Sequence, residues 1–473
     1  MLEEVRRTVR EKALQINIDG SRHGTFAEIG GGQEVARWFF HVGGAAGTVA
    51  KTMSAYDMAV SDAIYGPCAR YVSRQRLQAM LDHEWGLLLE RLAGKRGDKT
   101  RFFVFADTVA TRSYTRSEDG RGWLGIRFQT GPRGEPSEIL VHARMWDHDN
   151  ARQQEALGLL GVNLCYGACF LSHDPERLIG SLMDDLTRDR MEVDTIKFSG
   201  PAFLGVDNRL MSLQLVHQRL TNAAVFTAEG EVVEPAEVLH QRPVLIERGS
   251  FRPVTNVTLD MIDGALAEMR KEPELQDAEP VVLMEMTLRH LLATGSSIDF
   301  ADYLARVDTL SALGRMVMIS NYSRFHNVAM YLRRYTRNLV GMVLGVPTLE
   351  KICDEHFYND LEGGVLEALG RLFRGRVKLY LYPWKNQETG ELVTAENFRI
   401  GAGYEHLYAH LRENRFIVPI RRFKGEELSV FPGDVLERIQ RGDDSWERMV
   451  PAPVVPVIKR NGLFGFGGER DRA

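Results

Sequence analysis

The sequence predicts an α/β protein with mainly parallel sheets. Strand-length apolar runs alternate along the chain with segments of helix length, which is the pattern of βαβ units. At 473 residues the chain is too long for one ordinary core, so we expect more than one domain. Polar residues and glycines follow many of the expected strands, as they do in Rossmann-like sheets. We therefore expect two Rossmann-like lobes with an N-terminal helical and β-hairpin elaboration.

Residues 1–160 are the predicted N-terminal α+β region, which contains a glycine-rich turn. It opens with a short charged helix and a strand-like segment at 14–19. Further strands are expected at 25–29, 101–106, 123–128 and 138–145. Helices are expected to begin at Gln33 and to span about 47–64, 75–93 and 147–160. The Gly-, Arg- and Ser-rich segment 113–136 predicts a hairpin or a long loop around the strand 123–128.

Residues 161–275 and 276–450 are predicted as two α/β lobes, with a soft boundary in the polar, proline-bearing segment 270–280. The expected strands are 162–171, 195–199, 223–227, 243–247, 280–285, 316–320, 339–344 and 377–382. The expected helices are one that starts at Pro175, and 207–219, 325–334, 348–357 and 363–373. Residues 451–473 are rich in proline and glycine, and we expect an extended C-terminal tail there.

Charge and composition exclude several classes of function. The formal net charge is −5 and the pI is near 6.3, which disfavours a general nucleic-acid binder. No apolar run approaches the roughly 18 residues of a transmembrane helix. The first twenty residues mix acids and bases and lack the apolar stretch of a secretory signal. We therefore expect a cytoplasmic protein without a membrane partner.

The four cysteines do not predict a disulfide framework or a zinc site. Cys165 and Cys169 lie in the apolar run 162–171, where a strand would place both on one face. Neither has histidine or further cysteine at zinc spacing, so both are interpreted as small buried apolar residues. No H-E-x-x-H, G-x-S-x-G, C-x-x-C or EF-hand pattern is present, and no metal-ligating residue is assigned.

Candidate functional residues follow the expected strands, because ligands of open parallel sheets bind at the carboxyl ends of strands. Asp107 follows strand 101–106, Glu285 ends strand 280–285, and His326 follows strand 316–320. We assign these three as candidate catalytic residues, the carboxylates for Mg²⁺ or a substrate hydroxyl and the imidazole as acid or base. The alternative is that such residues are ordinary loop residues or helix caps.

Six residues are candidates for phosphate binding. Gly30, Gly31 and Gly32 form a turn between a strand and a helix, where backbone N–H groups can approach a phosphate. The same glycines could serve only a tight turn, because the spacing is not G-x-G-x-x-G. The other three candidates are side chains that follow strands, namely Arg324, Arg248 and Ser250. The Arg248 segment could equally be a charged hairpin edge.

Three phrases carry a family resemblance: residues 24–37 with the triple glycine, 248–255 beginning Arg-Gly-Ser-Phe-Arg-Pro, and Ile319–Tyr322. Over most of its length the chain resembles a bacterial protein family whose members are labelled nicotinate-nucleotide adenylyltransferase or TonB-dependent receptor. The receptor label implies an exported β-barrel, which the many expected helices contradict. The transferase label implies a Rossmann-like sheet and a phosphate ligand. Its H-x-G-H motif is absent, since the nearest match, Arg22–Thr25, lacks the second histidine, so no catalytic residue carries over.

Two functions remain open at this point, and a third, a nucleic-acid factor that uses Arg333-Arg334 and Lys459-Arg460, is disfavoured by the acidic balance. The first is a cytosolic enzyme that binds a nucleotide or phosphometabolite, with nucleotidyl or phosphoryl transfer as its chemistry and Mg²⁺ with a nucleotide as an open cofactor. This hypothesis requires Asp107, Glu285 and Arg324 to lie in one site and not in unrelated salt bridges. The alternative is a non-catalytic binding or assembly protein on an α/β scaffold, in which the apolar side of helix 75–93 would make homo-oligomer contacts.

Overall fold

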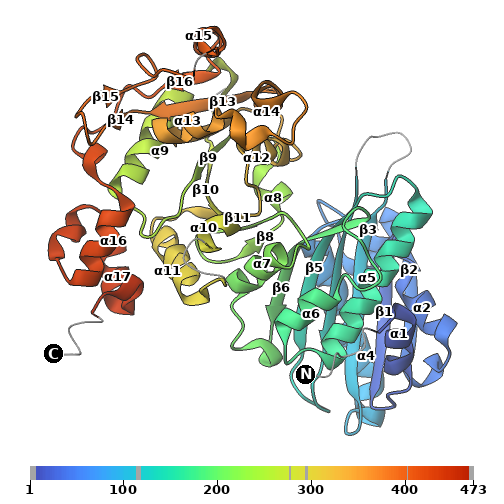
Figure 1. Ribbon diagram of the computed structural model, residues 1–473. Coiled ribbons are helices and arrows are strands. Elements are labelled where there is room, and N and C mark those ends of the chain that lie inside the picture. Colours follow the sequence, from blue (N-terminus) through green and yellow to red (C-terminus); the bar gives the residue numbers. More distant parts are fainter. Residues whose placement is uncertain (1–6, 113–118, 276–277, 293–296, 402, 468–473) are drawn as a thin grey trace. The chain divides into compact units, whose positions relative to one another are not determined.

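The computed structural model describes residues 7–112, 119–275, 278–292, 297–401 and 403–467. Parts of the expected 113–136 loop, the 270–280 boundary and the C-terminal tail therefore lie outside the described residues. The chain divides into two compact units, Met1–Ala224 and Val225–Ala473, and each contains a β-sheet with helices (Figure 1). The α/β class predicted from the sequence is confirmed.

The first unit is built on a six-stranded mixed sheet in the order β2-β1-β3-β4-β5-β6. Its strands are β1 (Arg22–Gly30), β2 (Val49–Ala55), β3 (Arg101–Ala110), β4 (Gly120–Phe128), β5 (Ser137–Met145) and β6 (Met191–Ser199). Strand β1 is parallel to β2 and β3, whereas β3, β4, β5 and β6 are successively antiparallel. The connections from β3 to β4 and from β4 to β5 are too short for a parallel crossover. These antiparallel strands of the first sheet correspond to the β-hairpin elaboration that the sequence predicts.

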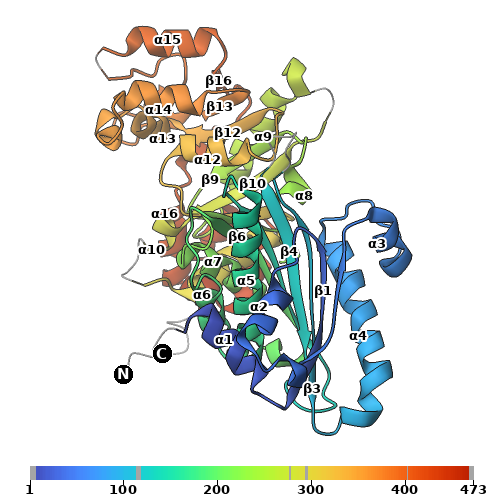
Figure 2. The ribbon, with the colours of Figure 1, turned by 90° about the vertical axis from the view of Figure 1, so that its right-hand side faces the viewer.

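Helices cover both faces of the first sheet. They are α1 (Val9–Asn17), α2 (Val35–Val42), α3 (Met58–Tyr65), α4 (Arg74–Arg96), α5 (Asn150–Phe170), α6 (Pro175–Ser181) and α7 (Asn208–His217). Figure 2 shows α4 on one face and α1, α2 and α5 on the other. Alternate residues of β1 supply the two cores, since Phe26 packs with the α5 side and Ala27 with the α4 side.

Three sequence predictions in this unit were wrong. The expected strand 14–19 lies mostly in α1, because Thr8 and Glu11 form a capping box that starts a helix there. The expected helix 47–64 is strand β2 followed by α3, which Asp57 caps. The expected strand 162–171 is the second half of α5, whose apolar residues are buried all round and so show no helical period. The predicted boundary at 160 consequently falls inside a helix.

The second unit is built on an eight-stranded sheet in the order β16-β13-β12-β9-β10-β11-β7-β8. The strands are β7 (Ala223–Phe226), β8 (Val232–Val233), β9 (Val244–Arg248), β10 (Val281–Thr287), β11 (Met316–Ser320), β12 (Val340–Gly345), β13 (Val377–Tyr382) and β16 (Ile417–Pro419). The six strands from β16 to β11 are parallel. Because β9 pairs with β10, residues on both sides of the predicted boundary at 275 build one sheet.

The strand order of the second sheet is that of a doubly wound Rossmann fold. The first parallel strand, β9, is central, with β10 and β11 added on one side. The chain then crosses back, and β12, β13 and β16 are added on the other side. Numbered along the chain, this is the order 3-2-1-4-5-6. The Rossmann-like prediction therefore holds for this sheet.

The helices of the second unit connect these strands and extend the C-terminus. They are α8 (Pro235–Leu239), α9 (Asn256–Met269), α10 (Leu288–Leu292), α11 (Phe300–Ser311), α12 (Phe325–Leu332), α13 (Val346–Ile352), α14 (Gly364–Leu372), α15 (Glu405–Glu413), α16 (Pro432–Arg441) and α17 (Val454–Asn461). A hairpin of β14 (Trp384–Lys385) and β15 (Leu392–Val393) follows β13. Helix α17 lies in the expected extended tail and is held by buried Val454 and Ile458, four residues apart.

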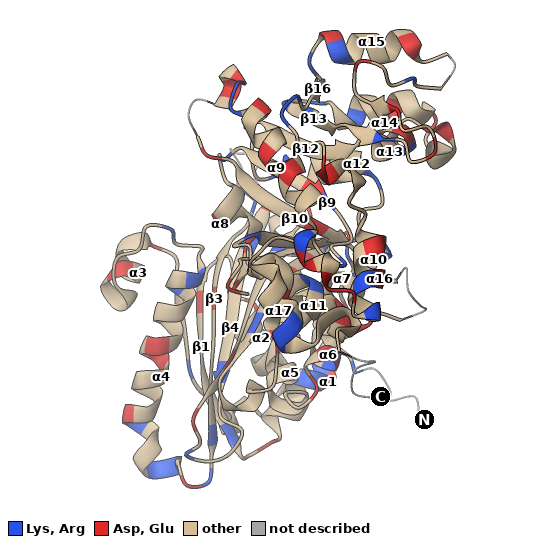
Figure 3. Cartoon of the chain, turned by 90° about the vertical axis from the view of Figure 1, so that its left-hand side faces the viewer, with Lys and Arg blue, Asp and Glu red and all other residues tan. Residues whose placement is uncertain are grey.

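Basic and acidic residues are interspersed over the helices of both units (Figure 3). Within the part of the chain that the structure describes, no helix has both the length and the apolar character needed to cross a bilayer.

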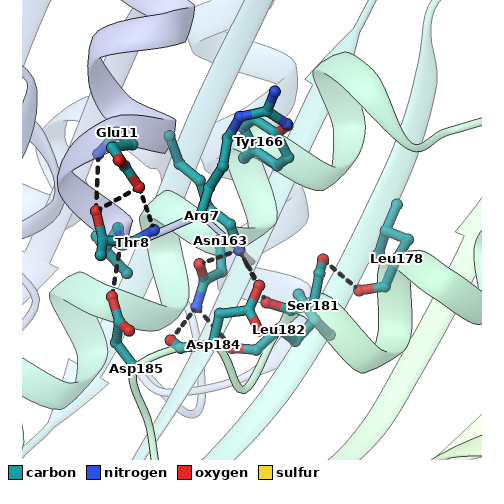
Figure 4. Close-up of polar contacts among 12 residues, drawn as sticks. Arg7, Thr8, Glu11, Asn163, Tyr166, Leu178, Ser181, Leu182, Asp184 and Asp185 are labelled. Atoms are coloured by element: carbon teal, nitrogen blue, oxygen red, sulfur yellow. Dashed lines mark hydrogen bonds and ion pairs between the residues drawn. The ribbon is translucent and has the colours of Figure 1, made fainter. Parts of the chain in front are cut away.

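A buried lysine fixes the N-terminal helix of the first unit. The Lys12 ammonium donates to Asn163 Oδ1 at 2.7 Å and pairs with the Asp184 carboxylate at 2.5 Å. Figure 4 shows the same region, where Asp185 accepts the N–H of Val9 at the start of α1. Because Lys12 is almost fully buried, its charge must be met by these acceptors.

Candidate functional site

The candidate site lies at the carboxyl edge of the second sheet. The chain reverses its direction of strand addition between β9 and β12, and ligands of open α/β sheets bind at such switch points. Strand β9 ends at Arg248, the first residue of the segment Arg248-Gly-Ser-Phe-Arg-Pro253 that the sequence had singled out. The ends of β10 and β11 lie next to it in the sheet.

Arg248 and Glu285 form the centre of the site. They are register partners on β9 and β10. The Arg248 guanidinium donates to both Glu285 oxygens, at 2.9 and 2.8 Å, and lies 4.5 Å from the centre of the Phe325 ring. The Ser320 hydroxyl at the end of β11 donates to the same carboxylate at 2.5 Å. Glu285 is therefore fully engaged, and Arg248 anchors the edge instead of standing free as a phosphate clamp.

A second ion-pair group holds the loop after Arg248. Asp302 of α11 accepts hydrogen bonds from Arg252 at 2.6 Å and from Arg306 at 2.8 Å. Arg306 also donates to the backbone carbonyl of Ser250 at 3.1 Å. Together with the pair before it, this cluster contains three arginines and two carboxylates, and the charge of Asp299 also acts on Arg306. The charges at this edge are therefore nearly balanced, and the partly exposed Arg252 is the arginine best placed to meet an anionic ligand.

Two polar groups at this edge are not engaged by the described residues. The half-buried Ser250 hydroxyl has no hydrogen-bond partner among them, and the Nδ1 atom of His290 is buried without one. Burial, then Arg248, lowers the pKa of His290 below its ordinary value, although Glu285 and a hydrogen bond to the backbone of Gly249 oppose this. The imidazole is therefore neutral at neutral pH and can accept a proton.

Arg324 and His326 make a different set of contacts. The Arg324 guanidinium forms a two-fold ion pair with the exposed Asp360 and lies 5.3 Å from the Tyr358 ring centre. His326 is buried with its ring 6.3 Å from that of Tyr358, and burial followed by Arg324 lowers its pKa. No described contact joins either side chain to Arg248 or Glu285, although Ser323, one residue before Arg324, accepts a hydrogen bond from Arg248.

The triple glycine of the first unit is explained by close packing on β3. Gly30 has φ +75°, and a Cβ there would lie 2.2 Å from the Val109 carbonyl oxygen. A Cβ on Gly32 would lie 2.1 Å from the Asp107 carboxylate. The N–H of Gly31 donates to Val109 at 3.1 Å. These contacts account for the glycines as a structural turn, which is the alternative that the sequence left open.

Asp107 is buried beside a second carboxyl group. It pairs in register with Glu28 of β1, and both side chains are almost inaccessible. Glu28 accepts the N–H groups of Val35 and Ala36 at the start of α2, at 2.8 and 3.4 Å. Burial raises the pKa of Glu28 to about 7, and burial with the Glu28 charge raises the pKa of Asp107. Asp107 and the glycines therefore belong to the first unit, and the other candidates belong to the second.

The candidates do not share one described site. Arg248, Ser250 and Glu285 come together, whereas Arg324 is paired with Asp360 and Asp107 with Glu28. Among the described residues, no three acidic, histidine or cysteine side chains are placed to hold a metal ion.

Sequence reasoning missed four residues of these clusters: Glu28, His290, Asp302 and Arg306. Two of them carried a usable signal, because Asp302 and Arg306 are four residues apart and can form an ion pair if that segment is a helix, which the sequence interpretation had not assigned. The other residues carried no such signal, because their contacts depend on which strands lie next to each other in the sheet.

Comparisons with known proteins return only weak structural similarity. No family model matches the chain, and no curated protein matches it. The chain is similar to the competence/damage inducible protein CihA from Agrobacterium tumefaciens, with 18% identity, 34% of this chain and 90% of that chain covered, and a TM-score of 0.24. A competence-damaged protein (CinA) superfamily protein from Enterobacter cloacae shares 15% identity over 35% of this chain and 93% of its own, with a TM-score of 0.24.

A third structure is a competence or damage-inducible protein from Enterobacter asburiae, with 14% identity, 34% and 98% coverage and a TM-score of 0.25. At such values these similarities assign no function to the chain.

Proposed function

We propose that the second unit binds a phosphate-bearing small molecule, a nucleotide or a phosphorylated metabolite, at the carboxyl edge of its sheet. The observation that carries this proposal is the 3-2-1-4-5-6 strand order, whose switch point lies between β9 and β12. The segment after β9 supplies the edge with the partly exposed Arg252.

The phosphate would meet Ser250, Arg252 and His290. Ser250 offers a free hydroxyl, His290 offers a nitrogen without a partner, and the Arg252 side chain is 29% exposed. Arg252 can turn to a ligand without leaving Asp302 unpaired, because Arg306 also binds that carboxylate. A charge-assisted hydrogen bond of this kind is the stronger type of anion contact.

A dinucleotide is a poorer fit than a small phosphate ligand. The loop lacks the G-x-G-x-x-G pattern that brings a pyrophosphate to the first helix. The N-terminus of α9 is also covered, since the N–H of Asn256 donates to the Met449 carbonyl at 2.9 Å. The amide of the Asn256 side chain donates to the Arg448 carbonyl at 2.8 Å.

Binding without catalysis is the second candidate, and one observation favours it. Both oxygens of Glu285 are held by Arg248, and Ser320 also donates to one of them. This leaves His290 as the described edge group suited to move a proton in nucleotidyl or phosphoryl transfer.

Thermal unfolding of the full chain against ligands tests the proposal. The panel holds ATP, GTP, NAD, NADP, nicotinate mononucleotide and sugar phosphates, each with and without Mg²⁺. A ligand at about 100 times its Kd stabilises the unit that binds it by about 2.7 kcal/mol. We expect a shift with one phosphate class, reduced in Ser250→Ala and Arg252→Ala.

The matched control is Arg270→Ala, which removes an arginine from a surface ion pair with Glu279. Its ligand shift should equal that of the wild type. A panel without any shift, or a shift that both edge variants retain, would overturn the proposal. Turnover of the stabilising ligand, lost in His290→Gln with binding kept, would separate an enzyme from a binding protein.

A further inference from the structure

Two adjoining cavities lie along β16, the outermost strand on one side of the second sheet. They are separate from the residues at the carboxyl ends of β9 and β10, which are here called the edge cluster. The first, here called the apolar cavity, has a volume of about 310 Å³. Its walls are mostly apolar and include Leu381, Ala395, Ile420 and Phe423, while Glu396 and Arg421 are its charged residues. The hairpin of β14 and β15, drawn beside β13 in Figure 1, supplies Leu392 at its rim. A concave, mainly apolar site of this size suits the ring or short chain of a small molecule.

The second, here called the charged cavity, has a volume of about 680 Å³. Most of its charged residues are paired with one another. Lys271 binds Glu268 at 2.8 Å, and Lys378 and Arg415 both bind Glu272. Glu274 also lines the cavity, so three carboxylates balance these three cations before Arg421 is counted.

Arg421 joins the two cavities. It lines both of them together with Pro419, so the cavities meet at the end of β16. Arg421 is exposed and pairs with no carboxylate among the described residues. A guanidinium without a partner, placed where an apolar cavity opens into a charged one, is suited to bind a carboxylate or phosphate.

We propose that these cavities form a second ligand site, which takes a small amphipathic anion with its apolar ring or chain in the apolar cavity and its acidic group on Arg421. The site uses no residue of the edge cluster, so it stands independently of the function proposed above.

A small molecule fits this edge better than an added peptide strand. Strand β16 has three residues and ends at Pro419, which has no N–H to donate. Short edge strands that contain proline resist pairing with a further strand. At the apolar cavity the N–H of Ile420 is already taken by the Leu381 carbonyl at 3.0 Å, so it is not available to an added strand.

Calorimetry with 3-phenylpropionate and its neutral amide, 3-phenylpropanamide, tests the site. We expect the acid to bind the full chain more tightly than the amide. Arg421→Gln should weaken the acid about tenfold and change the amide less than about twofold, because a charge-assisted contact is lost. Leu392→Ser should weaken both probes. Arg399→Gln is the matched control, since Arg399 is exposed and lines neither cavity.

Hydrogen exchange would locate the acid, with protection expected in 392–396 and 417–423. Circular dichroism confirms that each variant is folded. Equal affinity for acid and amide, loss of both probes in Arg421→Gln, or absence of binding to the folded wild type at millimolar concentration would overturn the proposal.

Discussion

The Arg248 guanidinium holds both oxygens of the Glu285 carboxylate, at 2.9 and 2.8 Å, across the two strands at the centre of the second sheet. Their side chains are 8% and 1% exposed, so neither charge can be satisfied by water. Removing one partner of such a pair leaves the other charge buried without a counter-charge. This lowers the free energy of unfolding by more than the intact pair adds to it.

We therefore predict that Arg248→Ala destabilises the second unit by about 3–5 kcal/mol. Glu285→Gln should cost less, because the amide keeps an acceptor for Arg248. Urea unfolding of both single variants and the double variant measures the coupling. If Arg248→Ala changed the free energy of unfolding no more than the surface variant Arg270→Ala, the anchoring role would be refuted.

The strands of the second sheet could be predicted closely from the sequence, but their neighbours could not. Segments 316–320 and 377–382 coincide with β11 and β13, because both are apolar runs bounded by turn residues. Arg248 and Glu285 were each singled out, yet their pairing depends on β9 lying next to β10. Glu28 was missed for the same reason, since its partner Asp107 belongs to a strand that comes much later in the chain.

The apolar run from Leu159 to Phe170 is a second segment whose secondary structure could not be predicted from the sequence. A segment buried on all sides shows neither the period of a strand nor that of a helix, so its length and neighbours must decide. The run continues the helix that starts after Asp149, and the sequence interpretation broke that helix at 160.

The carboxyl pair of the first unit predicts a dependence of stability on pH. Burial raises the pKa of Glu28 from 4.5 to about 7, with Glu34 acting in the same direction, and raises that of Asp107. Between pH 4.5 and about 7, the folded state therefore binds more protons than the unfolded state. Stability is then present at low pH and is lost as the pH rises from about 4.5 to 7.

Asp107→Asn removes one of the two acids and supplies an amide donor for Glu28. We predict that the variant gains at least about 1 kcal/mol over the wild type at pH 8 and little at pH 5. Unfolding of both proteins at the two pH values measures this. If the difference in the free energy of unfolding between the two proteins were the same at both pH values, repulsion between the Asp107 and Glu28 carboxylates would be refuted.

Gly32 tests the packing of the glycine turn. A Cβ there would lie 2.1 Å from the Asp107 carboxylate, so Gly32→Ala should destabilise the first unit by about 1–3 kcal/mol. Combining it with Asp107→Ala should recover part of the loss, because the clash disappears. Gly20→Ala is the control, since its Cβ would meet nothing within 4 Å. Equal melting temperatures for the Gly32 and Gly20 variants would contradict the assigned packing.

Lys12 should be the most sensitive residue of helix α1. Its ammonium is bound by Asn163, by Asp184 and by the Ser181 carbonyl at 3.2 Å, and it is only 2% exposed. Lys12→Ala removes the cation that pairs with the Asp184 carboxylate and the donor to the buried Asn163 Oδ1, and we predict a loss of about 3 kcal/mol or more from the first unit. Arg10→Ala, on the exposed side of the same helix, should change stability by less than about 0.5 kcal/mol. Hydrogen exchange across residues 9–17 distinguishes release of α1 from loss of the whole unit, and unchanged exchange in Lys12→Ala would show that the apolar contacts of α1 suffice to hold it.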